Sequence, residues 1–185
     1  MRYRLTDRLL PLTGQESPTG TESLVETMSR EEFLRAYPQL AARRPLARGL
    51  EHARFCKVEL LPDCAVGTLL LPRKDDLRGP GISLGYYLDR DRLLLLDDSG
   101  TADKLLRSMD AVRVPEGAVP RFFFEFLEAV VRDDAAFLQK YENHLDDLEE
   151  RVLESEVKDF DNKLHFYRRG LLRLSSYYSQ LTDLA

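Results

Sequence analysis

Two amphipathic helical patterns fill the last quarter of the chain, from Leu138 to Ala185, and they restrict the fold more than any other segment. Apolar residues recur there at alternating spacings of three and four, which places them on one stripe of a helix. Such stripes are stable when they pack against another element. The first stripe comprises Leu138, Tyr141, Leu145, Leu148 and Val152, and the second comprises Leu164, Tyr167, Leu171, Leu174, Tyr178 and Leu181.

The two stripes are out of register with each other, since the pattern slips between Val152 and Phe160. A turn between residues 155 and 159 explains the slip, and Ser155 or Asp159 is available there as an N-cap. One long helix with a stutter is the alternative. The capping residues favour an antiparallel hairpin. Its buried residues are expected to be Leu145, Leu148, Val152, Leu164, Leu171 and Leu174.

The second helix has no stop signal. Its stripe still holds Leu181 and Leu184, and no Gly, Asn or Pro follows. Helices usually carry such a residue at their end. We therefore expect this chain to be a piece of a longer protein.

The first half of the chain is typical of a sheet with short helices. Segments of strand length bounded by turn residues predict antiparallel hairpins. The continuous apolar runs Leu69–Leu71 and Leu93–Leu96 indicate strands that are covered on both faces. The expected strands are Arg2–Leu12 (one bent strand or two short ones), Leu24–Thr27, Phe55–Leu61, Ala65–Leu71, Ile82–Leu88 and Leu93–Asp97.

Helices are expected to cover this sheet. Ser29 and Glu32 form a capping-box motif that starts a helix ending before Pro38. Further helices are expected at about 46–53, at 102–109 and from about residue 120. The predicted fold is α+β: an α/β/α sandwich with a mixed, largely antiparallel central sheet, followed by a long C-terminal antiparallel helical hairpin. Residues 1–120 would form the core and residues 121–185 the hairpin.

Composition restricts the function. The net charge of -5 argues against nucleic-acid binding, and the arginines at 43, 44 and 48 are typical of a solvated surface. Cys56 and Cys64 flank a predicted turn at positions too far apart for a disulfide. The N-terminus lacks a signal-peptide pattern, and the longest apolar runs are far shorter than the roughly 18 residues that span a bilayer.

Catalysis has no support in the sequence, so we do not expect an enzyme. His52, His144 and His165 are widely spaced, without a Cys or second His at metal-ligand spacing. The glycine-rich segment from Gly79 to Gly85 lacks the Lys-Ser/Thr ending of a phosphate loop. We interpret it as the turn that enters a strand.

Acidic side chains dominate from Asp133 to Asp161, where eleven carboxylates face three cations. Such a run is usually a solvated helix face. It is also compatible with a weak, hydrated Mg²⁺ site, because Mg²⁺ often keeps several waters and needs only one or two carboxylates. The candidate ligands are Asp146, Glu149 and Glu150.

Two motifs resemble the cytoplasmic domain of CorA-like divalent-cation channels. Leu148-Glu149-Glu150-Arg151-Val152 is similar to the family's Leu-Glu-Glu-x-Val helix, and the segment from Arg168 to Leu174 is similar to its Lys/Arg-Arg-x-Leu-x-x-Leu helix. The run from His52 to Glu59 is similar to the family's His-x-Arg and Lys-Val-Glu pattern. With the order of elements, the resemblance covers most of the chain.

This resemblance implies a cytosolic regulatory domain on a long stalk helix, at the cytoplasmic face of the cell membrane. Two membrane helices with a Gly-Met-Asn motif would follow beyond Ala185, and the complete protein would be a homopentamer. Mg²⁺ would be the usual ion, with Co²⁺, Ni²⁺ or Zn²⁺ as alternatives, and cytosolic Mg²⁺ would close the channel. A soluble adaptor whose amphipathic C-terminal helices dock a partner is the alternative function.

The chain departs from the family pattern in two places. Arg48-Gly49 stands where relatives often carry a Glu-Asp pair, which puts the familiar Mg²⁺ sensor in doubt. Tyr177-Tyr178-Ser179-Gln180-Leu181 stands where relatives often have Pro-Leu after the basic motif. A divergent branch of the family is therefore expected.

Overall fold

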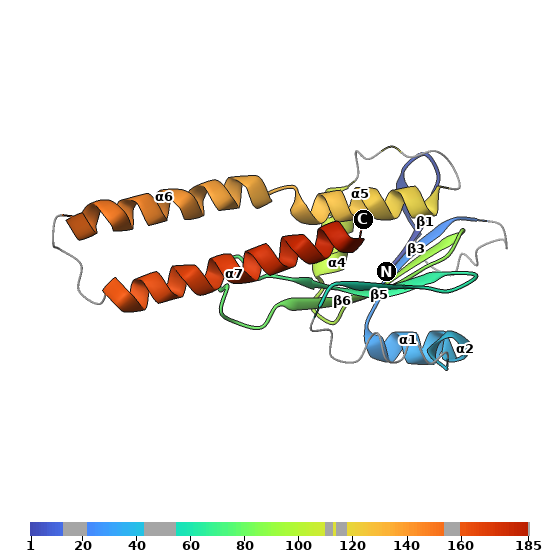
Figure 1. Ribbon diagram of the computed structural model, residues 1–185. Coiled ribbons are helices and arrows are strands. Elements are labelled where there is room, and N and C mark those ends of the chain that lie inside the picture. Colours follow the sequence, from blue (N-terminus) through green and yellow to red (C-terminus); the bar gives the residue numbers. More distant parts are fainter. Residues whose placement is uncertain (13–21, 43–54, 110–112, 114–117, 154–159, 185) are drawn as a thin grey trace.

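A seven-stranded sheet with helices on both faces forms the body of the protein, and a long helical hairpin projects from it (Figure 1). The computed structural model describes residues 1–12, 22–42, 55–109, 113, 118–153 and 160–184. In Figure 1, α1 and α2 lie on one face of the sheet, whereas α4 and α5 lie on the other. The predicted α+β class and sandwich architecture are confirmed.

The sheet is mixed, with the strand order β2-β1-β3-β7-β6-β5-β4. Neighbouring strands run antiparallel except for β3 and β7, which are parallel. The segment from Arg2 to Leu12 forms two short strands, one of the two alternatives that its pattern left open. The strands are β1 (Arg2–Leu5), β2 (Leu9–Pro11), β3 (Leu24–Met28), β4 (Lys57–Leu60), β5 (Ala65–Leu71), β6 (Ile82–Leu88) and β7 (Arg92–Leu96).

The helices begin close to their predicted positions. The capping box at Ser29 is present: its hydroxyl accepts from the Glu32 N–H at 3.1 Å, and the Glu32 carboxylate accepts from the Ser29 N–H at 2.7 Å. The helix expected near residues 46–53 lies outside the described residues. The described helices are α1 (Arg30–Ala36), α2 (Pro38–Ala41), α4 (Thr101–Ser108), α5 (Val119–Val131), α6 (Asp134–Leu153) and α7 (Phe160–Leu184).

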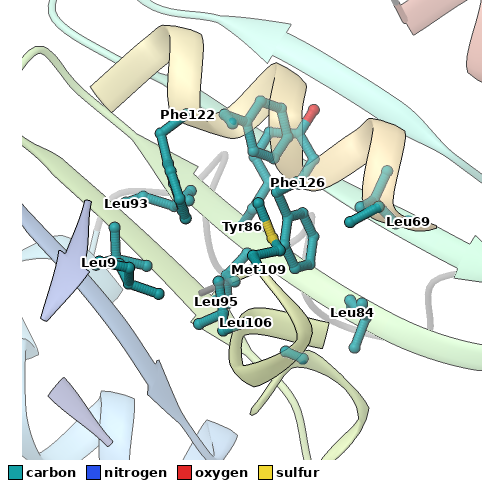
Figure 2. Packing of buried hydrophobic residues seen from close by; sticks show 14 of the residues in the cluster. Leu9, Leu69, Leu84, Tyr86, Leu93, Leu95, Leu106, Met109, Phe122 and Phe126 are labelled. Atoms are coloured by element: carbon teal, nitrogen blue, oxygen red, sulfur yellow. The ribbon is translucent and has the colours of Figure 1, made fainter. Parts of the chain in front are cut away.

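Strand β7 is covered on both faces, as its apolar run predicts. Leu93 and Leu95 belong to the core cluster that α4 and α5 cover, whereas Leu94 and Leu96 belong to a second cluster with Phe33 of α1. Figure 2 shows the first cluster, in which Phe126 and its neighbour Phe122 from α5 lie over the sheet residues. The alternation of side chains along a strand therefore fills two separate cores.

The two cysteines are free and lie in different clusters, Cys56 in the first and Cys64 in the second. The backbone N–H of Leu61 donates to the Cys64 carbonyl at 2.8 Å, which closes the predicted hairpin across Pro62 and Asp63. Each thiol is therefore buried on its own face of the sheet.

Helices α6 and α7 form the predicted antiparallel hairpin, and the single-helix alternative is wrong (Figure 1). Asp134 near the start of α6 contacts Tyr178 near the end of α7. Further along, the Tyr141 and Tyr167 rings lie edge to face with centroids 5.3 Å apart. The turn expected between residues 155 and 159 lies outside the described residues.

The predicted register of the hairpin is only partly right. Leu148 and Leu174 are buried, and Leu145 and Val152 are half-buried. Leu164 and Leu171, however, are 46% and 41% exposed, so their assignment to the buried stripe is wrong.

Gly170 explains the error in register, because it takes the inner position that was assigned to Leu171. Gly170 is buried, and a Cβ at this position would come within 2.2 Å of the Tyr141 hydroxyl. Helices α6 and α7 therefore approach each other closely at a residue without a side chain. A search for apolar side chains does not find such a residue.

Candidate functional site

The predicted Mg²⁺ ligands Asp146, Glu149 and Glu150 all lie exposed on α6. Their spacing of three and four places them on one face of the helix, and Leu148 turns inward instead. Across the described part of the chain, no group of three or more His, Cys, Asp and Glu side chains is arranged to hold a metal ion. A site at these carboxylates stays a prediction, of a kind in which the ion keeps most of its water.

The other sequence candidates have local structural settings. The His144 ring contacts the Lys140 carbonyl of its own helix, and His165 is exposed on α7. His52 lies outside the described residues. The segment from Gly79 leads into β6, which begins at Ile82, as interpreted from the sequence.

Asp134, one of the carboxylates of the acidic run, is buried and joins three elements at the base of the hairpin. Asp134, the first residue of α6, is only 5% exposed. Its Oδ2 accepts a hydrogen bond of 2.9 Å from the Tyr178 hydroxyl of α7. Its Oδ1 lies 2.5 Å from Nζ of Lys74 in the β5–β6 connection, in an ion pair, although no hydrogen bond of good geometry reaches this atom within the described residues.

The tyrosines beside Asp134 remain protonated under ordinary conditions. Burial is the main cause that raises the pKa of both Tyr177 and Tyr178 well above the usual value, and the neighbouring Asp134 charge adds to it. The Tyr178 phenol can therefore act as a lasting hydrogen-bond donor to the carboxylate. The junction therefore holds the end of α7 against the start of α6.

A cavity of about 610 Å³ lies beside this junction, and Arg73, Lys74, Asp75 and Asp134 contribute its charged lining. The charges are matched in pairs: Arg73 Nη2 lies 2.8 Å from Asp75 Oδ2, and Lys74 pairs with Asp134. Since each cation already has a carboxylate, the cavity offers little net charge to a free ion. These ion pairs therefore belong to the contact between the β5–β6 connection and the base of the hairpin.

Helix α7 contacts the segments that flank the sheet strands at two further points. Arg173, from the basic motif, donates to the carbonyls of Leu77 and Gly79, the latter at 2.8 Å. The Cys56 N–H donates to Oε1 of Gln180 at 2.8 Å. Tyr177, Tyr178 and Gln180 therefore supply contacts that hold α7 against the body. Sequence reasoning missed them because their partners lie far away in the chain.

Asp134→Ala is expected to lower the free energy of unfolding by about 2 to 3 kcal/mol, because it leaves the Tyr178 hydroxyl and Lys74 without their acceptor. Lys74 is partly exposed and regains some hydration, which keeps the loss below that of a fully buried pair. Urea unfolding measures the change. Glu142→Ala, an exposed position on the same helix, is the control. Equal stability of the two variants would show that the junction contributes nothing.

Comparison with known proteins gives structural matches only. No protein-family model and no curated protein sequence matches the chain. The full-length CmaX structure superposes with a TM-score of 0.71 at 18% identity, over 99% of this chain and 61% of CmaX. The complete CorA magnesium transporter from Methanocaldococcus jannaschii gives 0.69 at 18% identity, over 100% of this chain and 62% of CorA.

A cytoplasmic domain is also among the matches. The ZntB cytoplasmic domain from Vibrio parahaemolyticus superposes with a TM-score of 0.64 at 13% identity, over 100% of this chain and 78% of that domain. The similarity thus includes the sheet, its helices and the hairpin. The chain spans less than two thirds of the complete CmaX and CorA chains, and over its own length it has the fold that CmaX, CorA and ZntB share.

Proposed function

We propose that this chain is the cytoplasmic regulatory domain of a CorA-like divalent metal ion channel. The observation that carries the proposal is the fold, which matches CmaX, CorA and ZntB over 99 to 100% of the chain. The motifs around Glu149 and Arg173 agree with it. Mg²⁺ is the proposed ion, with Co²⁺, Ni²⁺ and Zn²⁺ as the other candidates.

The proposal places membrane crossing and pentamer formation in the complete protein. None of the helices in the described ranges is long and apolar enough to span a bilayer. Two apolar segments of about 20 residues beyond Ala185 would supply the membrane part. This domain would then lie at the cytoplasmic face of the cell membrane and respond to the ion that the pore conducts.

The proposed sensing element is the exposed face of α6 that carries Asp146, Glu149 and Glu150. Because the base of the hairpin is fixed to the sheet by Asp134 and Arg173, a force on the outer part of α6 would be transmitted to the body. Solvated carboxylates cannot strip the waters from Mg²⁺, so the isolated domain would bind the ion weakly. A neighbouring subunit in the pentamer would complete the site.

Titration of the isolated chain with MgCl₂, against NaCl of equal ionic strength, tests the sensing element. For a Kd of about 10 mM, the stabilisation at 10 mM Mg²⁺ is only about 0.4 kcal/mol. We expect a small rise in Tm that disappears in the variant Asp146→Asn/Glu149→Gln/Glu150→Gln and persists in Glu142→Gln. Micromolar binding, or a rise that the triple variant retains, would place the ion elsewhere.

The alternative function is an adaptor whose hairpin docks a partner helix. Leu164, Leu171 and Leu172 favour it, because they are exposed on α7 and Leu172 is 62% exposed. If the complete protein lacks apolar membrane segments and binds a partner through these leucines, the adaptor replaces the channel. Leu171→Asp would then abolish partner binding without unfolding the chain.

A further inference from the structure

We propose that the outer half of the hairpin holds a binding site for a small polyphosphate, distinct from the acidic face of α6. A cavity of about 420 Å³ lies between α6, α7 and the β5–β6 connection. Among the described residues, its lining carries three permanent cations, Arg78, Arg151 and Lys163, and one carboxylate, Asp147. Positive charge therefore collects in this cavity although the chain as a whole has a net charge of -5.

These three cations come from three separate elements and share no carboxylate. Arg78 belongs to the β5–β6 connection, Arg151 to the end of α6 and Lys163 to the first turn of α7. Within the described part of the chain, none of them forms an ion pair. Convergence of unpaired cations has an electrostatic cost that a bound anion removes.

The cavity is partly organised before a ligand arrives. The Arg78 guanidinium carbon lies 4.7 Å from the centroid of the Phe166 ring, a cation–π contact that favours this position of the side chain. Asn162, also in the lining, adds an amide donor.

The donor set indicates phosphate groups. Arginine matches phosphate oxygens through its planar fork, and lysine adds a point charge. A single halide ion would leave most of the volume and two of the three cations without a partner. Two or more linked phosphates, from a free metabolite or from a lipid headgroup, suit the cavity better. This inference goes beyond the proposed channel function and does not depend on it.

Calorimetric titration of the chain with sodium tripolyphosphate, in divalent-free buffer at constant ionic strength, tests the site. We expect a Kd below about 1 mM, and we expect Arg151→Gln and Lys163→Gln each to weaken binding roughly tenfold. Arg168→Gln removes the same charge from α7 outside the cavity, and it should change the affinity less than twofold. Circular dichroism checks that each variant is folded, and either cavity variant suffices for the comparison.

A second arm of the experiment distinguishes the sources of phosphate. Phosphatidylcholine vesicles with and without phosphatidylinositol bisphosphate replace tripolyphosphate, and co-sedimentation that Lys163→Gln abolishes would assign the site to a lipid headgroup. Tripolyphosphate binding without vesicle binding would assign it to a free metabolite. Absence of both, or equal weakening by Arg168→Gln and the cavity variants, would overturn the proposal.

Discussion

Replacing Phe126 by alanine is expected to lower the free energy of unfolding by about 3 to 5 kcal/mol. Phe126 is fully buried where α5 crosses the sheet (Figure 2). Its ring centroid lies 6.4 Å from that of Phe123, which packs on Tyr86 of β6. Its removal leaves a cavity between the two layers that neighbouring side chains cannot fill. Chemical denaturation monitored by circular dichroism measures the loss.

Phe124 supplies the matched control on the same helix. It is 54% exposed, so Phe124→Ala removes an identical side chain from the solvent side of α5 and should change stability by less than about 1 kcal/mol. If the two variants lose equal stability, α5 does not present the face to the sheet that the structure gives it.

Leu174→Ala should destabilise the chain by about 2 to 5 kcal/mol, the second-largest effect that we expect. Leu174 is buried in the inner stripe of α7, between Gly170 and Tyr177. Its truncation would leave a cavity at this inner position, so thermal unfolding should begin at a lower temperature.

Leu171→Ala provides the comparison, because it removes the same atoms one turn earlier on α7. Leu171 is 41% exposed, and its truncation should cost less than about 1 kcal/mol. The register read from apolar spacing alone predicts instead that both changes are severe. A large loss for Leu171→Ala would restore that register and contradict the position of Gly170.

The pattern of apolar residues was sufficient to predict most of the sheet and its helices. The hairpins followed from strand-length runs between turn residues, and the run from Leu93 to Leu96 correctly indicated cover on both faces. The parallel pairing of β3 with β7 could not be assigned, because it joins segments more than 60 residues apart in the sequence. Pairing over such distances depends on the tertiary arrangement rather than on local pattern.

The hairpin shows where pattern reasoning fails. Gly170 and Leu171 lie three and four residues after Tyr167, so either could take the next position in the inner stripe of α7. Hydrophobicity alone favours Leu171 for this position. In the structure Gly170 takes this position, because the Tyr141 hydroxyl occupies the space that a side chain would need. The close approach depends on residues of both helices, so the apolar pattern of α7 alone could not predict it.

Only some of the candidate sites could be predicted from the sequence. The exposed carboxylates of α6 were identifiable from composition, since charge density is a local property. Asp134 looked like one more member of that run, and only its contacts with Lys74 and Tyr178 distinguish it. The cavity with Arg78, Arg151 and Lys163 could not be predicted either, because Arg78 lies more than 70 residues before the other two cations in the sequence.

The proposal that this chain regulates a divalent-cation channel is tested most directly by Mg²⁺ flux through the complete natural protein. The protein is reconstituted in liposomes that contain a Mg²⁺-sensitive dye. We predict Mg²⁺ entry down its gradient, and slower entry when Mg²⁺ is raised on the side that bears this domain. Absence of flux, or flux that is indifferent to Mg²⁺ on that side, would contradict the claim.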